Sequence, residues 1–73
     1  MNTPSQAKKA ALRAIEVGGG PATLAESLGI RYQAVQRWKL QQRIPVARVL
    51  AVEQVTGVSR HDLRPDIYPR EKI

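Results

Sequence analysis

The stretch "PATLAESLGIRYQAVQRWKL" constrains the fold of this chain more than any other. Two helices joined by a tight turn need a small residue where they approach most closely, and Ala25 supplies one. Gly29 follows four residues later, where the turn needs a left-handed backbone that glycine adopts without strain. Val35 and Trp38 would then anchor the second helix on the first, and this spacing predicts a helix-turn-helix. The residues expected to hold the pair together are Leu24, Ala25, Leu28, Gly29, Ile30, Val35 and Trp38.

Glycine and proline divide the rest of the chain into short helical segments. No segment alternates apolar and polar residues as a half-buried strand does, so we expect an all-α fold, a compact bundle of four to five short helices. The predicted helices cover 5–17, 21–28, 32–41 and 45–56, with a last helical turn at 59–63. We expect one domain over 1–73, with an ordered core at about 5–68 and tails at 1–4 and 69–73.

The charge balance points to a polyanionic partner. Twelve Lys and Arg against six Asp and Glu leave the 73-residue chain with a net charge of +6. Nucleic acid is the first candidate and an anionic membrane surface the second, while a basic protein without either partner is the alternative. The absence of cysteine excludes a disulfide framework, a thiolate zinc site and a cysteine nucleophile. The sequence has neither the ~18-residue apolar run of a membrane span nor a secretory signal, so we expect a cytoplasmic protein.

The outer side of the second helix of the pair carries the side chains of most interest. Gln33, Gln36, Arg37 and Leu40 fall at i, i+3, i+4 and i+7, a stripe that points away from the predicted core, and Tyr32 lies beside it. Glutamine can pair with adenine and arginine with guanine in the major groove, and tyrosine can contact a thymine methyl or a phosphate. We therefore predict DNA base contacts by Tyr32, Gln33, Gln36 and Arg37. The alternative is that these polar side chains only solvate a helix face.

The chain resembles the Cro-like, YdaS-type prophage repressors and antitoxins, a group with a lambda-repressor-like helix-turn-helix. The resemblance lies in "LAESLGIRYQAVQRW" and "RIPVARVLAVEQVTGVSRHDLRPDIYP", where "LRPDIYP" after "TGVS" is a specific signature. It implies an all-α DNA-binding domain that binds operator half-sites as a dimer, with Tyr32, Gln33, Gln36 and Arg37 at the positions of base contact. One departure is Arg31, which stands where members of the group often have Ser or Thr.

Five further residues are predicted to contact DNA phosphates. Arg31 cannot accept the N–H groups at the helix start, so a cap worth about 1 kcal/mol is lost, and a nearby phosphate would explain the arginine better than a tolerated surface substitution. Arg48 is expected in the first turn of the fourth helix, where a phosphate shared with backbone N–H groups would offset its unfavourable charge. Lys39 and Arg43 lie at and beyond the end of the second helix of the pair. Thr23 lies at the start of the first, which crosses the DNA backbone in this motif.

We predict no catalytic, metal or cofactor site. His61 is the only histidine, and a metal site would need further ligands of its kind or cysteines. The serines lack a paired base and an orienting acid. The three consecutive glycines at 18–20 lack the lysine and the preceding strand of a phosphate-binding loop. We therefore expect a protein that is not an enzyme.

The predicted function is a transcriptional regulator that binds a pseudo-palindromic operator in double-stranded DNA as a homodimer, which can be weak without DNA. The helix at 45–56 is apolar nearly all round, which favours either a self-association patch or burial beneath Ile67 and Tyr68. Two other functions stay open, a protein-interaction adaptor that uses this helix and a non-specific DNA coater. A YdaS-type antitoxin would share the DNA chemistry and would need a toxin partner, which is unknown.

Overall fold

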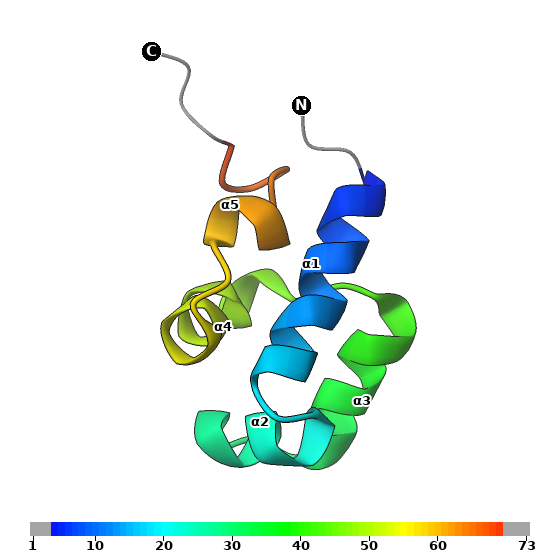
Figure 1. Cartoon of the computed structure of the whole chain (residues 1–73), viewed down its shortest axis with the longest axis vertical. Coiled ribbons are helices and arrows are strands. Elements are labelled where there is room, and N and C mark those ends of the chain that lie inside the picture. Colours follow the sequence, from blue (N-terminus) through cyan, green and yellow to red (C-terminus); the bar gives the residue numbers. More distant parts are fainter. Residues whose placement is uncertain (1–3, 70–73) are drawn as a thin grey trace.

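Helices make up the whole secondary structure of residues 4–69, which are the residues that the computed structural model describes (Figure 1). The elements are α1 (Pro4–Val17), α2 (Pro21–Leu28), α3 (Tyr32–Gln41), the 3-10 helix η1 (Val46–Arg48), α4 (Val49–Thr56) and α5 (Arg60–Leu63). The predicted all-α class is confirmed. The predicted tails at 1–4 and 69–73 lie outside the described residues, apart from Pro4 and Pro69.

The hydrophobic core lies around α1, which runs through the middle of the molecule with α2 and α3 near one end and α5 near the other (Figure 1). Ala11 and Ala14 of α1 are fully buried, and their small side chains allow the neighbouring helices to approach closely. The buried apolar residues are Ala10, Ala11, Ala14, Ile15, Leu24, Ala25, Val35, Trp38, Ile44, Val49, Val52, Val58 and Leu63. Every helix except η1 therefore contributes to a single core.

Two glycine turns set the direction of α2. Between α1 and α2, Gly19 and Gly20 both have φ of 95°, a conformation that residues with a side chain rarely adopt. After α2, Gly29 has φ of 68°, and the Ile30 N–H donates to the Ala25 carbonyl at 3.0 Å. The predicted bounds of α2 and α3 are confirmed, and the left-handed turn at Gly29 is confirmed with them.

The prediction of one continuous helix over 45–56 is wrong. The segment begins with the 3-10 turn η1 and becomes α-helical only at Val49, so Arg48 lies at the junction of η1 and α4 and not in the first turn of an α-helix. The physical reason is that Ile44 and Val49 are both fully buried, and the chain between them must cross the surface. A 3-10 turn rises about 2 Å per residue, more than an α-helix, and covers that distance in few residues.

Candidate nucleic-acid interface

Helix α3 has a buried side and an exposed side. Val35 and Trp38 point into the core, as predicted. Gln33, Gln36 and Arg37 are exposed on the other side of the helix. The exposed residues of α3 also include Tyr32 at its start and Leu40 near its end. The predicted division of α3 is therefore confirmed, and its four predicted base-contact residues share one end of the exposed surface.

The orientation of α3 depends on its packing and on how its ends are held. Leu24 and Ala25 of α2 are buried against it, and these two helices are in extensive contact. At the C-terminal end, Gln42 adopts a left-handed conformation with φ of 54°, and the Arg43 N–H donates to the Trp38 carbonyl at 3.0 Å. Since Ile44 is then fully buried, the chain is anchored again within three residues of the helix end.

The exposed polar side chains of α3 have no partners among the described residues. Within residues 4–69, Tyr32, Gln33, Gln36 and Arg37 make no side-chain hydrogen bond or ion pair with another residue. The same holds, in this described part of the chain, for four of the predicted phosphate contacts: Thr23, Arg31, Lys39 and Arg48. Their hydrogen-bonding capacity is therefore directed to solvent or to a ligand.

The start of α3 lacks the side-chain cap that most helices use. Arg31 occupies the N-cap position with an extended backbone, and among the described residues no side chain accepts a hydrogen bond from the first turn. The Arg31 side chain is exposed. The Ala34 N–H donates to the Arg31 carbonyl at 3.0 Å. The N–H groups of Tyr32 and Gln33 have no side-chain acceptor among the described residues and lie beside a positive charge, as the sequence predicted.

Lys39 and Thr23 both lie beside the turn between α1 and α2. Lys39 lines a shallow hollow together with Gly19, Gly20 and Pro21. Thr23 stands over the same turn, because a Cβ added at Gly19 would lie 2.8 Å from its methyl carbon. The structure thus brings these two predicted phosphate contacts to one place, next to the uncapped start of α2 at Gly20.

Arg48 is placed differently from the prediction. Its side chain is exposed, but its own N–H donates to the Pro45 carbonyl at 2.9 Å, and the Val49 N–H donates to the Val46 carbonyl. These donors are therefore occupied by η1. The predicted phosphate site that combined Arg48 with free N–H groups of a helix start therefore cannot use these two donors, and the contact of Arg48 with a phosphate stays a prediction.

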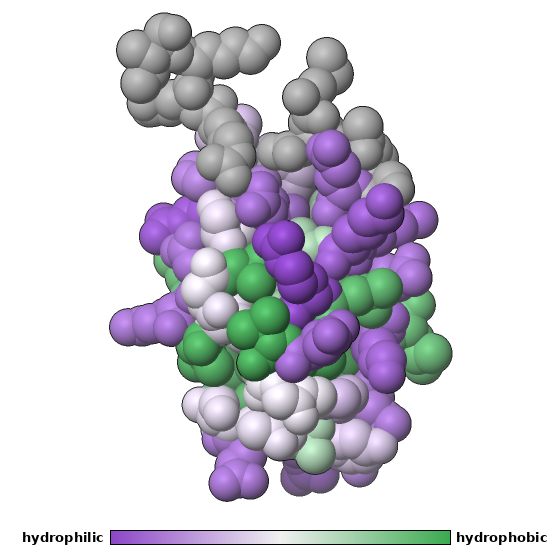
Figure 2. Space-filling model, viewed as in Figure 1, coloured by the Kyte–Doolittle hydropathy of each residue, from purple (hydrophilic) through white to green (hydrophobic). Residues whose placement is uncertain are grey.

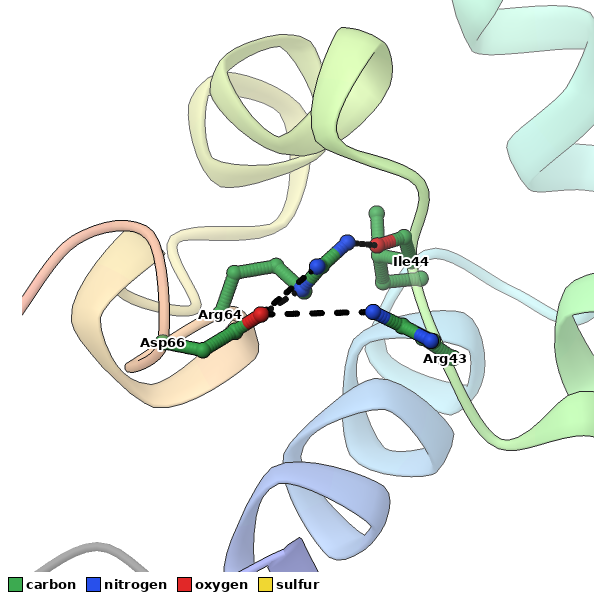
Figure 3. Close-up of polar contacts among 4 residues, drawn as sticks. All are labelled: Arg43, Ile44, Arg64 and Asp66. Atoms are coloured by element: carbon green, nitrogen blue, oxygen red, sulfur yellow. Dashed lines mark hydrogen bonds and ion pairs between the residues drawn. The ribbon is translucent and has the colours of Figure 1, made fainter.

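Arg43 belongs to an ion cluster that the sequence did not reveal (Figure 3). Arg64 is buried with 6% of its surface exposed, and its Nη1 donates to the Ile44 carbonyl at 3.1 Å. Its Nε and Nη2 donate to the two carboxylate oxygens of Asp66 at 3.0 and 2.8 Å. The Nη2 of Arg43 lies 3.9 Å from the same carboxylate. We call Ile44, Arg64 and Asp66 the arginine clasp, and Arg43 lies beside it.

The electrostatics of the arginine clasp follow from these contacts. The hydrogen bonds from Arg64 lower the pKa of Asp66 to about 2, and Arg43 contributes to this shift through its charge. In turn, the hydrogen bond to Asp66 raises the pKa of Arg64 against the opposing effect of burial. The clasp ties the turn after α5 to the loop after α3. A sequence signal existed in retrospect, since Arg64 follows the apolar Leu63 and precedes an acidic residue by two positions.

A second set of polar contacts holds α5 in place. The carboxylate of Glu53 accepts hydrogen bonds from the N–H of Arg60 at 2.7 Å and from its Nε at 3.0 Å, and these bonds lower the pKa of Glu53. Ser59 caps α5 by accepting from the His61 N–H, and His61 Nδ1 lies 2.8 Å from the Tyr68 carbonyl oxygen. His61 is therefore part of the contacts between α5 and the C-terminal turn.

The outer side of η1 and α4 is exposed and apolar. Val46, Leu50 and Val55 each keep nearly half of their surface accessible, and so does Ile67, which was one candidate to cover them. Tyr68 packs against the core instead. Of the two predicted alternatives, the exposed patch is therefore confirmed. Figure 2 shows hydrophobic atoms across the middle of one face, at the level of α4, between more hydrophilic regions.

Two further kinds of feature are absent from residues 4–69. No group of three or more His, Cys, Asp or Glu side chains in this range could hold a metal ion. No helix in the same range is long and apolar enough to cross a membrane.

Comparisons with known proteins agree in pointing to phage biology. The family model described as bacterial toxin YdaS matches residues 12–72 of the chain. The chain is 36% identical over 70 residues to the Gene 30 protein of Enterobacteria phage phi80, an alignment that covers 93% of this chain and 96% of the relative. No solved structure matches significantly. The matched region includes α2, α3 and the arginine clasp.

Proposed function

The chain belongs to the YdaS toxin family of phage and prophage proteins, and from this premise we propose that it is a sequence-specific DNA-binding regulator. In this proposal α3 enters the major groove and contacts an operator half-site. The observation that carries the proposal is the unpartnered outer side of α3 in a chain of net charge +6. The side chains of eight of the nine predicted DNA contacts make no hydrogen bond or ion pair with another residue within 4–69.

The four proposed base contacts suit the chemistry of the major groove. Gln33 and Gln36 can each donate to and accept from one adenine, and Arg37 can donate two hydrogen bonds to one guanine. Tyr32, at the start of α3, can reach a thymine methyl group or a phosphate. The N-terminal residues of a recognition helix contact base edges, and all four residues lie within the first six positions of α3.

The proposed phosphate contacts come from elements before and after these four residues. Thr23 lies in α2, Arg31 in the turn before α3, Lys39 near the end of α3 and Arg48 in η1. Contacts of this kind hold the protein in register and raise its affinity for any sequence. Arg43 can join them if a phosphate replaces the 3.9 Å ion pair with Asp66.

Dimerisation is part of the proposal, and the exposed patch on η1 and α4 supports it. Two copies with a charge of +6 each repel one another, so they need a contact surface without charge. The exposed residues Val46, Ala47, Leu50, Ala51, Gln54 and Val55 form such a surface. Ala51 in α4 is small, which allows a second helix to approach closely at that position.

A selection from a random-sequence oligonucleotide pool tests the proposed function. Enrichment of two half-sites about 10 bp apart supports a dimeric regulator. Binding without enrichment indicates a non-specific DNA coater, and absence of binding at moderate salt favours the protein-interaction adaptor.

The dimer surface is tested with Leu50→Glu and with Ser27→Glu as a control that adds the same charge on the exposed side of α2. We expect Leu50→Glu to give a monomer in sedimentation and to weaken binding to a two-half-site operator at least about ten-fold. Binding to a single half-site should be weakened no more in Leu50→Glu than in Ser27→Glu, whose added charge lies one helical turn from Thr23. An unchanged oligomeric state in Leu50→Glu would place the dimer contact elsewhere.

The family description favours a second candidate function, a role in a toxin–antitoxin pair. Such a role would use the same DNA chemistry if the protein acts as an antitoxin. Induced expression of the wild type and of Arg37→Ala in a bacterial host separates the possibilities. Growth arrest that persists in Arg37→Ala points to an activity independent of base contacts, and arrest that disappears links any toxicity to DNA binding.

A further inference from the structure

Leu40 is the most exposed large hydrophobic residue in the part of the chain that the structure describes. It is 86% exposed, whereas the six others range from 43% to 58%. It follows Gln36 by four positions and Arg37 by three, so it lies on the same side of α3 about one helical turn further along. An apolar side chain thus continues the row of polar side chains proposed to contact bases.

The chemistry of the major groove limits what an apolar side chain can gain there. Every base edge presents hydrogen-bond donors and acceptors, and the one apolar group among them is the 5-methyl group of thymine. Leucine can neither donate nor accept a hydrogen bond. A polar base edge opposite Leu40 would therefore lose its water without compensation, whereas a thymine methyl group would lose unfavourable contact with water.

We propose that Leu40 is a specificity-determining residue that contacts the 5-methyl group of a thymine in the operator half-site. This inference rests on the proposed function and adds one base identity to it. The thymine lies beside the base pairs contacted by Gln36 and Arg37, because Leu40 is only about 6 Å further along the helix axis. The exposed patch on α4 does not explain Leu40, because Leu40 lies on the side of α3 directly opposite Val35 and Trp38 and the core that α4 joins.

The replacement of thymine by uracil tests this contact, since uracil lacks only the methyl group. The half-site enriched from the random pool is synthesised with each thymine replaced in turn, and binding of the wild type, Leu40→Ala and Leu40→Met is measured. We expect one replacement to weaken wild-type binding about four-fold, the effect of one buried methyl group. Leu40→Ala should bind the thymine-containing half-site about four-fold more weakly than the wild type does. Its affinity should not fall further when that one thymine is replaced by uracil. Leu40→Met, which keeps an apolar side chain, should retain most of the affinity and the sensitivity to uracil.

Two controls make the result specific to Leu40. Because the side chain is exposed, Leu40→Ala should unfold at the same urea concentration as the wild type, so a loss of binding is not a loss of folding. Gln36→Ala should bind more weakly but keep the sensitivity at the same uracil position.

The inference is overturned if no uracil replacement weakens wild-type binding. It is also overturned if Leu40→Ala keeps the full sensitivity to uracil, which would assign the methyl contact to another residue. A pool that yields no motif overturns the proposed function as well. If the pool yields a motif but the effect of no uracil replacement depends on Leu40, this inference is overturned and the proposed function is not.

Discussion

Arg37 and Arg64 are the same type of side chain in two regions that use it in opposite ways. Arg37 lies on the outer side of α3, exposed and without an intramolecular partner among the described residues. Arg64 lies in the C-terminal turn, buried and hydrogen-bonded to Ile44 and Asp66. The comparison teaches that the twelve Lys and Arg side chains include some that hold the chain together and others that are available to a ligand.

Arg43 connects the two regions. It is exposed like Arg37, yet it shares Asp66 with Arg64 at a distance of 3.9 Å. An ion pair this long between exposed groups contributes little to stability. Its guanidinium therefore stays within reach of a phosphate, while the clasp next to it keeps the loop after α3 in place. The experiments below test how far the two regions are separate.

The largest expected effect is on stability, from Arg64→Met. The substitution leaves the Ile44 carbonyl and the Asp66 carboxylate without their donors, and we expect the free energy of unfolding to fall by about 2–3 kcal/mol. Urea denaturation measures the change. The matched variant Arg37→Met should alter the same quantity by less than about 0.5 kcal/mol, because its side chain has no partner to lose. Equal losses of unfolding free energy in the two variants would show that Arg37 and Arg64 do not differ in their contribution to stability.

The next effect is on DNA binding, from Arg37→Ala. We expect specific binding to weaken by about 1–3 kcal/mol and the preference at one base pair to relax, because a two-bond contact to guanine is lost. Competition binding with single-base variants of the operator measures both changes. An equal loss on specific and random DNA would show that Arg37 contacts the backbone and not a base.

A smaller effect distinguishes the role of Arg43. In Arg43→Gln the slope of log K against log salt should become less steep by about 0.9, as expected for one lost phosphate contact. Arg48→Gln is the comparison variant, and we expect the same change there, since Arg48 has no competing carboxylate. If the slope changes in Arg48→Gln but not in Arg43→Gln, then Asp66 retains Arg43 in the complex and Arg43 belongs with the clasp.

The smallest effect is the acid sensitivity of the clasp. The folded-state pKa of Asp66 is about 2, below its ordinary value of 3.8, so its stabilising contribution is present above pH 4 and is lost as the pH falls towards 2. Thermal unfolding of the wild type and of Asp66→Asn across this range measures it. The stability difference between the two proteins should shrink as the pH falls. A constant difference from pH 5 to pH 2 would mean that the carboxylate charge does not stabilise the clasp.

Local signals explain why α2 and α3 were predicted with their correct bounds. Pro21 begins α2 and Gly29 ends it, and the spacing of Val35 and Trp38 identifies the buried side of α3. The remaining side of α3 was then predicted to be exposed, because it carries no residue of the buried set. The break at η1 was missed because no proline or glycine marks Val49, and the 3-10 turn results from the need to connect two buried residues across the surface.

The sequence by itself determined the helical class, the turn at Gly29 and the row of side chains on the outer side of α3, because each depends on residues within a few positions of one another. Only the tertiary structure decided that Arg64 is a buried structural residue and that Arg43 stands beside Asp66. The contact between Arg64 and Ile44 spans 20 positions, and its strength comes from burial, which a sequence pattern does not measure. The sequence already placed Leu40 in that row, and the tertiary structure added how fully its side chain is exposed.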